Sequence, residues 1–91
     1  MNSIAGKIVN SATTVSTTIV PIPTTAATGR RTVLIYNNGS ETVYLGDSDV
    51  TTTTGYPLAA GDEKAFDLKN EVILYGRTAS GSSNIRTMEG V

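Results

Sequence analysis

Two aspartates separated by one serine, in Asp47-Ser48-Asp49, could place two carboxylates around a cation. Calcium is a hard cation that prefers oxygen ligands, so the residue types suit it. An EF-hand loop also needs further ligands, a glycine at a fixed place and a closing glutamate, and this segment lacks them. Aspartate and serine are also common turn residues, because their side chains bond nearby backbone amides. The segment therefore predicts a turn, and we expect no metal site.

A second acidic group could in principle hydrolyse a glycoside. It consists of Asp62, Glu63, Asp67 and Glu71. Glycoside hydrolysis needs two carboxyl groups facing each other across a sugar, one of them with a pKa raised by burial. Each of these four acids lies in or beside a polar turn, or on the polar face of a predicted strand. We therefore expect solvated surface acids.

Histidine and cysteine are both absent, which excludes several kinds of active site. A Ser-His-Asp arrangement cannot form, nor can a thiolate zinc site or a disulfide. A serine activated by lysine would need one of Lys7, Lys64 and Lys69 beside a positioned serine, and no motif ties them together. We predict that the protein is not an enzyme, and we assign no catalytic, cofactor-binding or metal-binding residue.

Arginine and tyrosine side chains could instead stack on a base or a sugar. Arg30-Arg31 precedes an apolar run, and Tyr36 and Tyr44 would face each other across a predicted hairpin. The segment Asn38-Gly39-Ser40 also matches a glycosylation sequon. Cross-strand packing, a solvated strand start and a tight turn explain the same residues, so we attach no function to them.

Charge and hydropathy exclude two classes of partner. A net charge of −1 with 16% charged residues offers no broad basic surface, so we expect no nucleic-acid partner. No stretch approaches the roughly 18 consecutive apolar residues of a membrane span. The first residues also lack the apolar run of a secretory signal. We expect no membrane partner, and synthesis in a cytoplasm.

The elements that would position these residues are strands, because threonine, valine and isoleucine abound and suit a pleated backbone. Alternation predicts strands over residues 3–10, 13–20, 31–36, 41–45, 63–68, 71–75 and 84–89. Asn-Gly between 31–36 and 41–45 predicts a hairpin. Short strands with turns about every 8–12 residues are typical of a sandwich or barrel. The predicted fold is all-β: a small antiparallel β-sandwich or barrel-like (jelly-roll-like) domain.

At 91 residues, one domain is expected. We divide the chain into residues 1–12, an N-terminal arm or first edge strand, and residues 13–91, a single β-sandwich domain. A domain this small has little stability to spare without disulfides or metals, so we expect a homo-oligomer or attachment to a larger assembly. Residues 1–20 are the segment we expect to reach a neighbouring subunit by strand addition.

One stretch resembles a known family. Residues 43–51 read VYLGDSDVT, and residues 55–62 read GYPLAAGD. Together with the turn at 37–39, Leu74-Tyr75 and the segment 85–89, this order is similar to that of small proteins of tailed bacteriophages and prophages. The resemblance covers roughly the last two-thirds of the chain and departs at Gly76-Arg77-Thr78, where the family continues with alanines. It implies a virion structural component: a head decoration (cement) protein, a head-fibre base or a β-sandwich attached to the tail. It transfers no functional residue.

On this basis we expect a non-enzymatic virion protein that decorates or stabilises a bacteriophage capsid by docking on the major capsid protein lattice. Its partners would be the major capsid protein or another virion protein, and its location the virion. The alternative is a carbohydrate- or receptor-binding module of a phage tail or fibre. That module would use tyrosine faces at Tyr36, Tyr44, Tyr56 and Tyr75. A non-viral adhesive or periplasmic domain is a third possibility, which the missing secretory signal disfavours.

Overall fold

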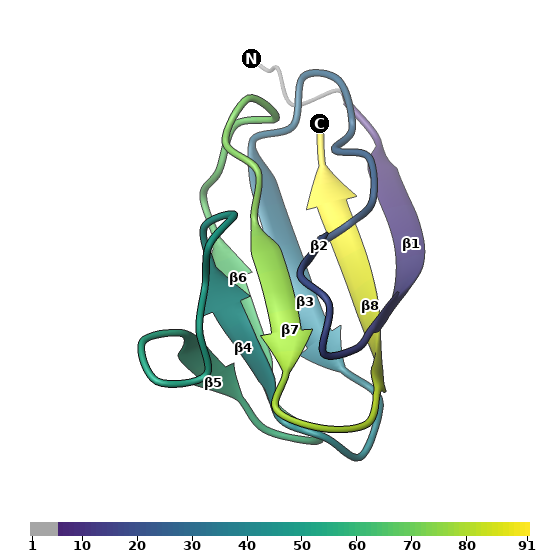
Figure 1. The fold of residues 1–91 in the computed structure, drawn as a ribbon. Coiled ribbons are helices and arrows are strands. Elements are labelled where there is room, and N and C mark those ends of the chain that lie inside the picture. The colour runs from purple at the N-terminus through teal and green to yellow at the C-terminus, as the bar shows by residue number, and fades with distance from the viewer. Residues whose placement is uncertain (1–5) are drawn as a thin grey trace.

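A computed structural model describes residues 6–91 as two four-stranded antiparallel sheets packed face to face (Figure 1). The strands are β1 (Ile8–Val15), β2 (Val20–Pro21), β3 (Thr32–Asn37), β4 (Val43–Gly46), β5 (Tyr56–Leu58), β6 (Glu63–Phe66), β7 (Tyr75–Thr78) and β8 (Ser83–Gly90). The first sheet has the order β1-β8-β3-β6, and the second has the order β2-β7-β4-β5. Within the described residues, no helix is long and apolar enough to cross a membrane.

The strands pair in a nested order. β1 pairs with β8, β2 with β7, β3 with β6 and β4 with β5, all antiparallel. Only β4 and β5, among the described strands, are consecutive in the chain and adjacent in one sheet; each other connection crosses between sheets. Eight strands wound in this way form a jelly roll. The predicted all-β sandwich of jelly-roll type is confirmed.

The predicted hairpin around Asn38-Gly39 is wrong. β3 pairs with β8 and β6, whereas β4 pairs with β7 and β5, so the segment between them passes from one sheet to the other. A type I′ turn needs positive φ at both central residues, and neither Asn38 nor Gly39 adopts it. Instead, the Asn38 amide donates to the Asn84 carbonyl at 2.8 Å. The apolar sides of β3 and β4 are buried against each other across the core, which outweighs local turn preference.

Two predicted strand boundaries also change. Residues 3–10 and 13–20 were expected to form two strands, but a single edge strand, β1, runs over Ile8–Val15; residues 1–5 lie outside the described part. The division predicted between residues 12 and 13 therefore falls inside β1. Residues 71–74 are not a strand: β7 begins at Tyr75. The backbone before it is held by other partners, including the Arg30 guanidinium on the Val72 carbonyl at 2.7 Å.

The core lies between the sheets, and burial alternates along β1, β3, β4, β7 and β8. In β3, Val33 and Ile35 are fully buried while their neighbours face outward. The buried apolar cluster consists of Val15, Ile22, Val33, Ile35, Val43, Leu45, Leu58, Leu74 and Ile85. Gly76 lies in β7 beneath Ile22, and a Cβ there would lie 2.5 Å from Ile22 Cδ1. The alternation also defines the side chains that point away from the core, and those of the first sheet form the candidate site.

Candidate functional site

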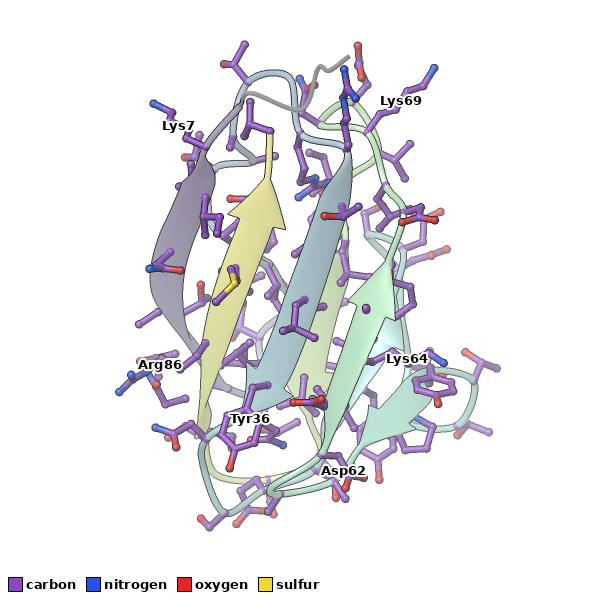
Figure 2. The ribbon with its side chains drawn as sticks, turned by 180° about the vertical axis from the view of Figure 1, so that it is seen from behind. Lys7, Tyr36, Asp62, Lys64, Lys69 and Arg86 are labelled. Atoms are coloured by element: carbon purple, nitrogen blue, oxygen red, sulfur yellow. The ribbon has the colours of Figure 1, made fainter. Side chains whose placement is uncertain are left out.

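The outward side of the first sheet, hereafter the outer face, carries an uncovered apolar surface (Figure 2). The strand register aligns its side chains in rows: Asn10, Met88, Leu34 and Ala65 form one row, and Ala12, Arg86, Tyr36 and Glu63 form the next. Ile8 begins a third row and is 64% exposed, while Met88 is 44% and Tyr36 38% exposed. Large apolar side chains thus lie in solvent on adjacent strands, where a partner could cover them together.

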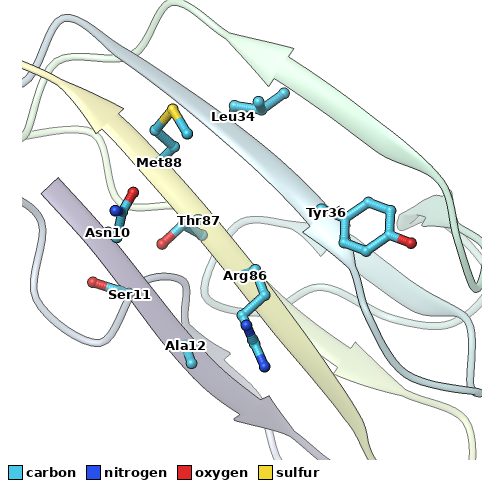
Figure 3. Close-up of a pocket in the computed structure, with 8 residues that line it drawn as sticks. All are labelled: Asn10, Ser11, Ala12, Leu34, Tyr36, Arg86, Thr87 and Met88. Atoms are coloured by element: carbon cyan, nitrogen blue, oxygen red, sulfur yellow. The ribbon is translucent and has the colours of Figure 1, made fainter. Parts of the chain in front are cut away.

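The outer face is hollowed at two places. One shallow hollow of about 480 Å³ is centred on Met88, Leu34, Tyr36 and Arg86, and is lined on the β1 side by residues 10–12. Figure 3 shows Met88 and Leu34 on neighbouring strands, with Arg86 and Tyr36 one row further along. A second hollow of about 420 Å³ continues past Ile8, Lys7 and Arg31 toward Val91. Together they cover much of the length of the sheet.

The lining of the first hollow is mostly apolar and uncharged. The first hollow contains one cation, Arg86, whose Nε donates to Asn84 Oδ1 at 2.8 Å. No acid, thiol or imidazole lines it. Within residues 6–91, no three His, Cys, Asp or Glu side chains lie close enough to hold a metal ion. Covering Met88 or Ile8 would contribute roughly 1–2 kcal/mol each by removing apolar area from water.

The tyrosines do not form one stacking platform. Tyr36 lies on the outer face, whereas Tyr44 and Tyr75 point outward from the second sheet, on the opposite side of the sandwich. The expectation that Tyr36 and Tyr44 face each other across a hairpin is therefore wrong, because β3 and β4 are not paired. Tyr56 lies at the margin between the sheets, where the Lys64 ammonium is 5.7 Å from its ring centroid. Such a contact is a cation–π interaction.

The predicted Asp47-Ser48-Asp49 turn is present. The Ser48 amide donates to Asp47 Oδ1 at 2.8 Å, and the Val50 amide donates to the Asp47 carbonyl at 3.0 Å. One carboxylate oxygen is therefore engaged by the local backbone, as in ordinary turn chemistry. All three residues of the turn are exposed.

The other acids and lysines that the sequence analysis considered are spread over the surface. Asp62, Glu63, Asp67 and Glu71 are all exposed. Figure 2 shows Lys7 and Lys69 near one end of the sandwich, with Asp62 at the other end. Lys64 is directed toward Tyr56. Among the described residues, no lysine forms a hydrogen bond to a serine, so the structure does not bring together the pair that serine–lysine chemistry would need.

The adjacent arginines lie in different environments. Arg31 is exposed at the second hollow, whereas Arg30 is 2% exposed and forms an ion pair with Glu89, Nη1 to Oε2, at 3.1 Å. Arg30 also donates to the carbonyls of Leu68, Lys69 and Val72. This ion pair was not predicted from the sequence. The signal was the alternation of β8, which places Glu89 on the same side as buried Ile85.

Asn37, which was predicted to lie in a turn, forms a second buried polar cluster. Its Nδ2 donates to the carbonyls of Glu41 and Leu58 at 2.8 and 2.9 Å. Its Oδ1 accepts from the Gly39 amide at 3.1 Å and from Ser83 Oγ at 2.6 Å. All four hydrogen-bonding positions of the amide are thus occupied. The cluster ties the β3–β4 crossing to β5 and β8 and is structural.

Comparison with known proteins places the chain in no family. No family model matches the sequence, and no curated protein matches it. Among solved structures, the chain is similar to a protein from a study titled "Bacillus endospore appendages form a novel family of disulfide-linked pili". The TM-score is 0.48 and the identity 13%, over 96% of this chain and 88% of that one. Nothing about the fold or the function of this chain is taken from this likeness.

Proposed function

We propose that this chain is a non-catalytic structural protein that docks through its outer face on a repeating protein surface, as a decoration of a bacteriophage capsid. The observation that carries the proposal is the exposure of Ile8, Met88 and Tyr36 on adjacent rows of one sheet. The phage assignment comes from the sequence resemblance of residues 43–62 and the segments around them.

The composition of the outer face suits a protein partner. Methionine, tyrosine and arginine are enriched in protein interfaces, and Met88, Tyr36 and Arg86 lie together in the first hollow. The hollow is shallow, so it fits a protein surface better than it encloses a small molecule, which usually needs a deep pocket. Arg86 at one side and Glu63 at the end of the same row could pair with opposite charges on the partner.

Attachment to a lattice suits a domain of this size. A single contact over a shallow hollow binds weakly, because the free energy from burying its surface must first offset the loss of translational and rotational freedom. A capsid offers many identical sites, and linked copies of the chain would gain avidity from binding several sites together. The major capsid protein is therefore the partner we propose, and the virion is the proposed location.

The test begins with particles of the phage whose genome encodes this chain. Mass spectrometry of purified particles is expected to find the chain at a high, symmetry-related copy number. Its absence from intact particles would refute the proposal.

The surface is tested by adding purified chain to particles that lack it and measuring cosedimentation. Met88→Glu would bury a carboxylate in the interface, so we expect binding to weaken by about tenfold or more. Val72→Glu is the matched control, because Val72 is 50% exposed in the β6–β7 connection, outside both hollows. Equal binding by both variants would remove the outer face from the proposal.

A glycan- or receptor-binding module is the second candidate, favoured by the exposed Tyr36 ring beside Arg86 in the first hollow. A glycan array tests it directly. Binding that is lost in Tyr36→Ala but kept in Tyr44→Ala would support a sugar site on the outer face. An array without signal would refute the glycan-binding candidate and leave protein docking as the proposed function.

A further inference from the structure

The two sheets present four edge strands, and three of them are poorly suited to pairing with another chain. β2 has two residues and contains Pro21, and β5 has three residues and contains Pro57. β6 has four residues and carries Glu63 and Lys64. Short length, proline and charge are the usual means by which proteins prevent edge-to-edge association. These three edges are therefore protected.

The fourth edge, β1, has none of these protections. It is eight residues long, IVNSATTV, with no charge, no proline and no glycine. Its register with β8 is continuous from Ile8 opposite Gly90 to Val15 opposite Ser83, so no bulge interrupts it. Figure 1 shows β1 at the margin of the sandwich, with β8 beside it on one side.

The orientation of the β1 backbone follows from one hydrogen bond. The Val91 amide donates to the Lys7 carbonyl at 3.0 Å, so the backbone N–H and C=O of Lys7 point toward β8. In an antiparallel ladder, successive residues direct their backbone N–H and C=O groups to opposite sides of the strand. The odd-numbered residues of β1 therefore form hydrogen bonds with β8, and the even-numbered residues direct these groups away from β8. Ile8, Asn10, Ala12 and Thr14 thus direct their N–H and C=O groups to the free edge. Among the described residues, no backbone hydrogen bond reaches them from that side.

We propose that two copies of this chain pair through β1, antiparallel, about a two-fold axis at Ser11. Hydrogen bonds between the two copies must join residues whose N–H and C=O groups lie at the free edge, so even-numbered residues pair with even-numbered ones. The register that overlaps β1 most fully places Ile8 opposite Thr14 and Asn10 opposite Ala12 of the second copy. It forms about eight interchain backbone hydrogen bonds and sets no like charges side by side. The partner is a second copy because this edge complements itself.

The dimer joins the two outer faces into one continuous eight-stranded sheet. The row of Arg86 and Ala12 continues into the row of Asn10 and Met88 in the second copy. The first hollow of each copy, lined by residues 10–12, then lies beside the new strand pair, one on either side. This pairing is a property of the isolated chain, so it stands or fails independently of the docking proposal.

The absence of cysteine provides a direct test. Two Ser11 residues on the axis would form a non-hydrogen-bonded pair with Cα atoms about 4.5 Å apart, within the range of a disulfide. We expect Ser11→Cys to form a disulfide-linked dimer rapidly under mild oxidation. Ala65→Cys on the protected edge β6 is the matched control and is expected to cross-link far more slowly. Equal rates for the two variants would overturn the proposal.

Two measurements on the chain complete the test. Sedimentation from micromolar to millimolar concentration is expected to show a monomer–dimer equilibrium, with amide exchange of Ile8, Asn10, Ala12 and Thr14 slowing as dimer forms. Ala12→Pro removes an outward N–H in each copy and leaves the β8 ladder intact, so we expect dimerisation to weaken by about tenfold or more. Ala65→Pro, with circular dichroism to verify folding of both variants, is the control. A monomer at all concentrations would overturn the proposal.

Discussion

Replacing Arg30 by methionine tests the buried polar cluster that holds one end of the sandwich together. The guanidinium donates from Nε to the Leu68 carbonyl at 3.0 Å, and from Nη2 to the carbonyls of Lys69 and Val72 at 3.0 and 2.7 Å. Its Nη1 donates to Glu89 Oε2 at 3.1 Å, where the Ala27 amide also donates at 3.0 Å. Arg30 thus connects β8 to the β6–β7 connection.

The expected loss is large because Glu89 is 0% exposed. Methionine has similar length and no charge, so Arg30→Met leaves the Glu89 carboxylate buried with the Ala27 amide as its remaining described partner. Removing one member of a buried ion pair costs about 3–5 kcal/mol. A domain of this length has about 5–14 kcal/mol of stability in total. The variant is expected to lose about 12 °C or more in Tm.

Urea denaturation followed by circular dichroism measures the free energy of unfolding for each variant. Arg31→Met is the matched control: the neighbouring arginine is exposed, and we expect a change within about 0.5 kcal/mol. Arg30→Lys keeps the charge but loses the planar fork, so it should fall between the two. Replacing both Arg30 and Glu89 by methionine should recover most of the loss, because no buried charge is left unpaired. If Arg30→Met were as stable as Arg31→Met, the assigned role of the pair would be refuted.

Further predictions concern the second polar cluster, two glycines and the acidic turn. Asn37→Ala removes four hydrogen bonds in the core and is expected to cost about 2–4 kcal/mol in urea denaturation; a change below 1 kcal/mol would contradict that. Gly39→Ala would place Cβ 2.7 Å from Ser83 Cα and 2.8 Å from Asn84 N, forcing backbone to move, so we expect a loss of several °C in Tm. Gly61→Ala meets no atom within 4 Å but has φ +84°, so its cost should be only the conformational one, about 1 kcal/mol. Because Asp47-Ser48-Asp49 forms a turn, adding calcium or EDTA should leave Tm unchanged. A rise in Tm with calcium would contradict this prediction and support a cation site at the turn.

Much of the fold could be predicted from side-chain alternation, and much of the candidate site could not. Val33, Ile35 and Ile85 were placed on strands correctly because alternation reports directly which residues a sheet buries. Most residues of the outer face were also on predicted strands, and Ala12 lies between two of them. Their assembly into one hollow was not predicted, because Tyr36 and Met88 are more than fifty positions apart in the sequence and become neighbours only when β3 pairs with β8.

The amino-acid sequence by itself determined that the chain is all-β and that it lacks the imidazole and thiol groups on which many active sites depend. Only the tertiary structure decided which strands pair, that the Asn37 segment crosses between sheets, that Arg30 is buried while Arg31 is exposed, and that β1 is a long unprotected edge. The reason is physical. Period-two alternation states which side of a strand leaves water, but the strand beside it is chosen by burial over the whole core, which no local pattern contains.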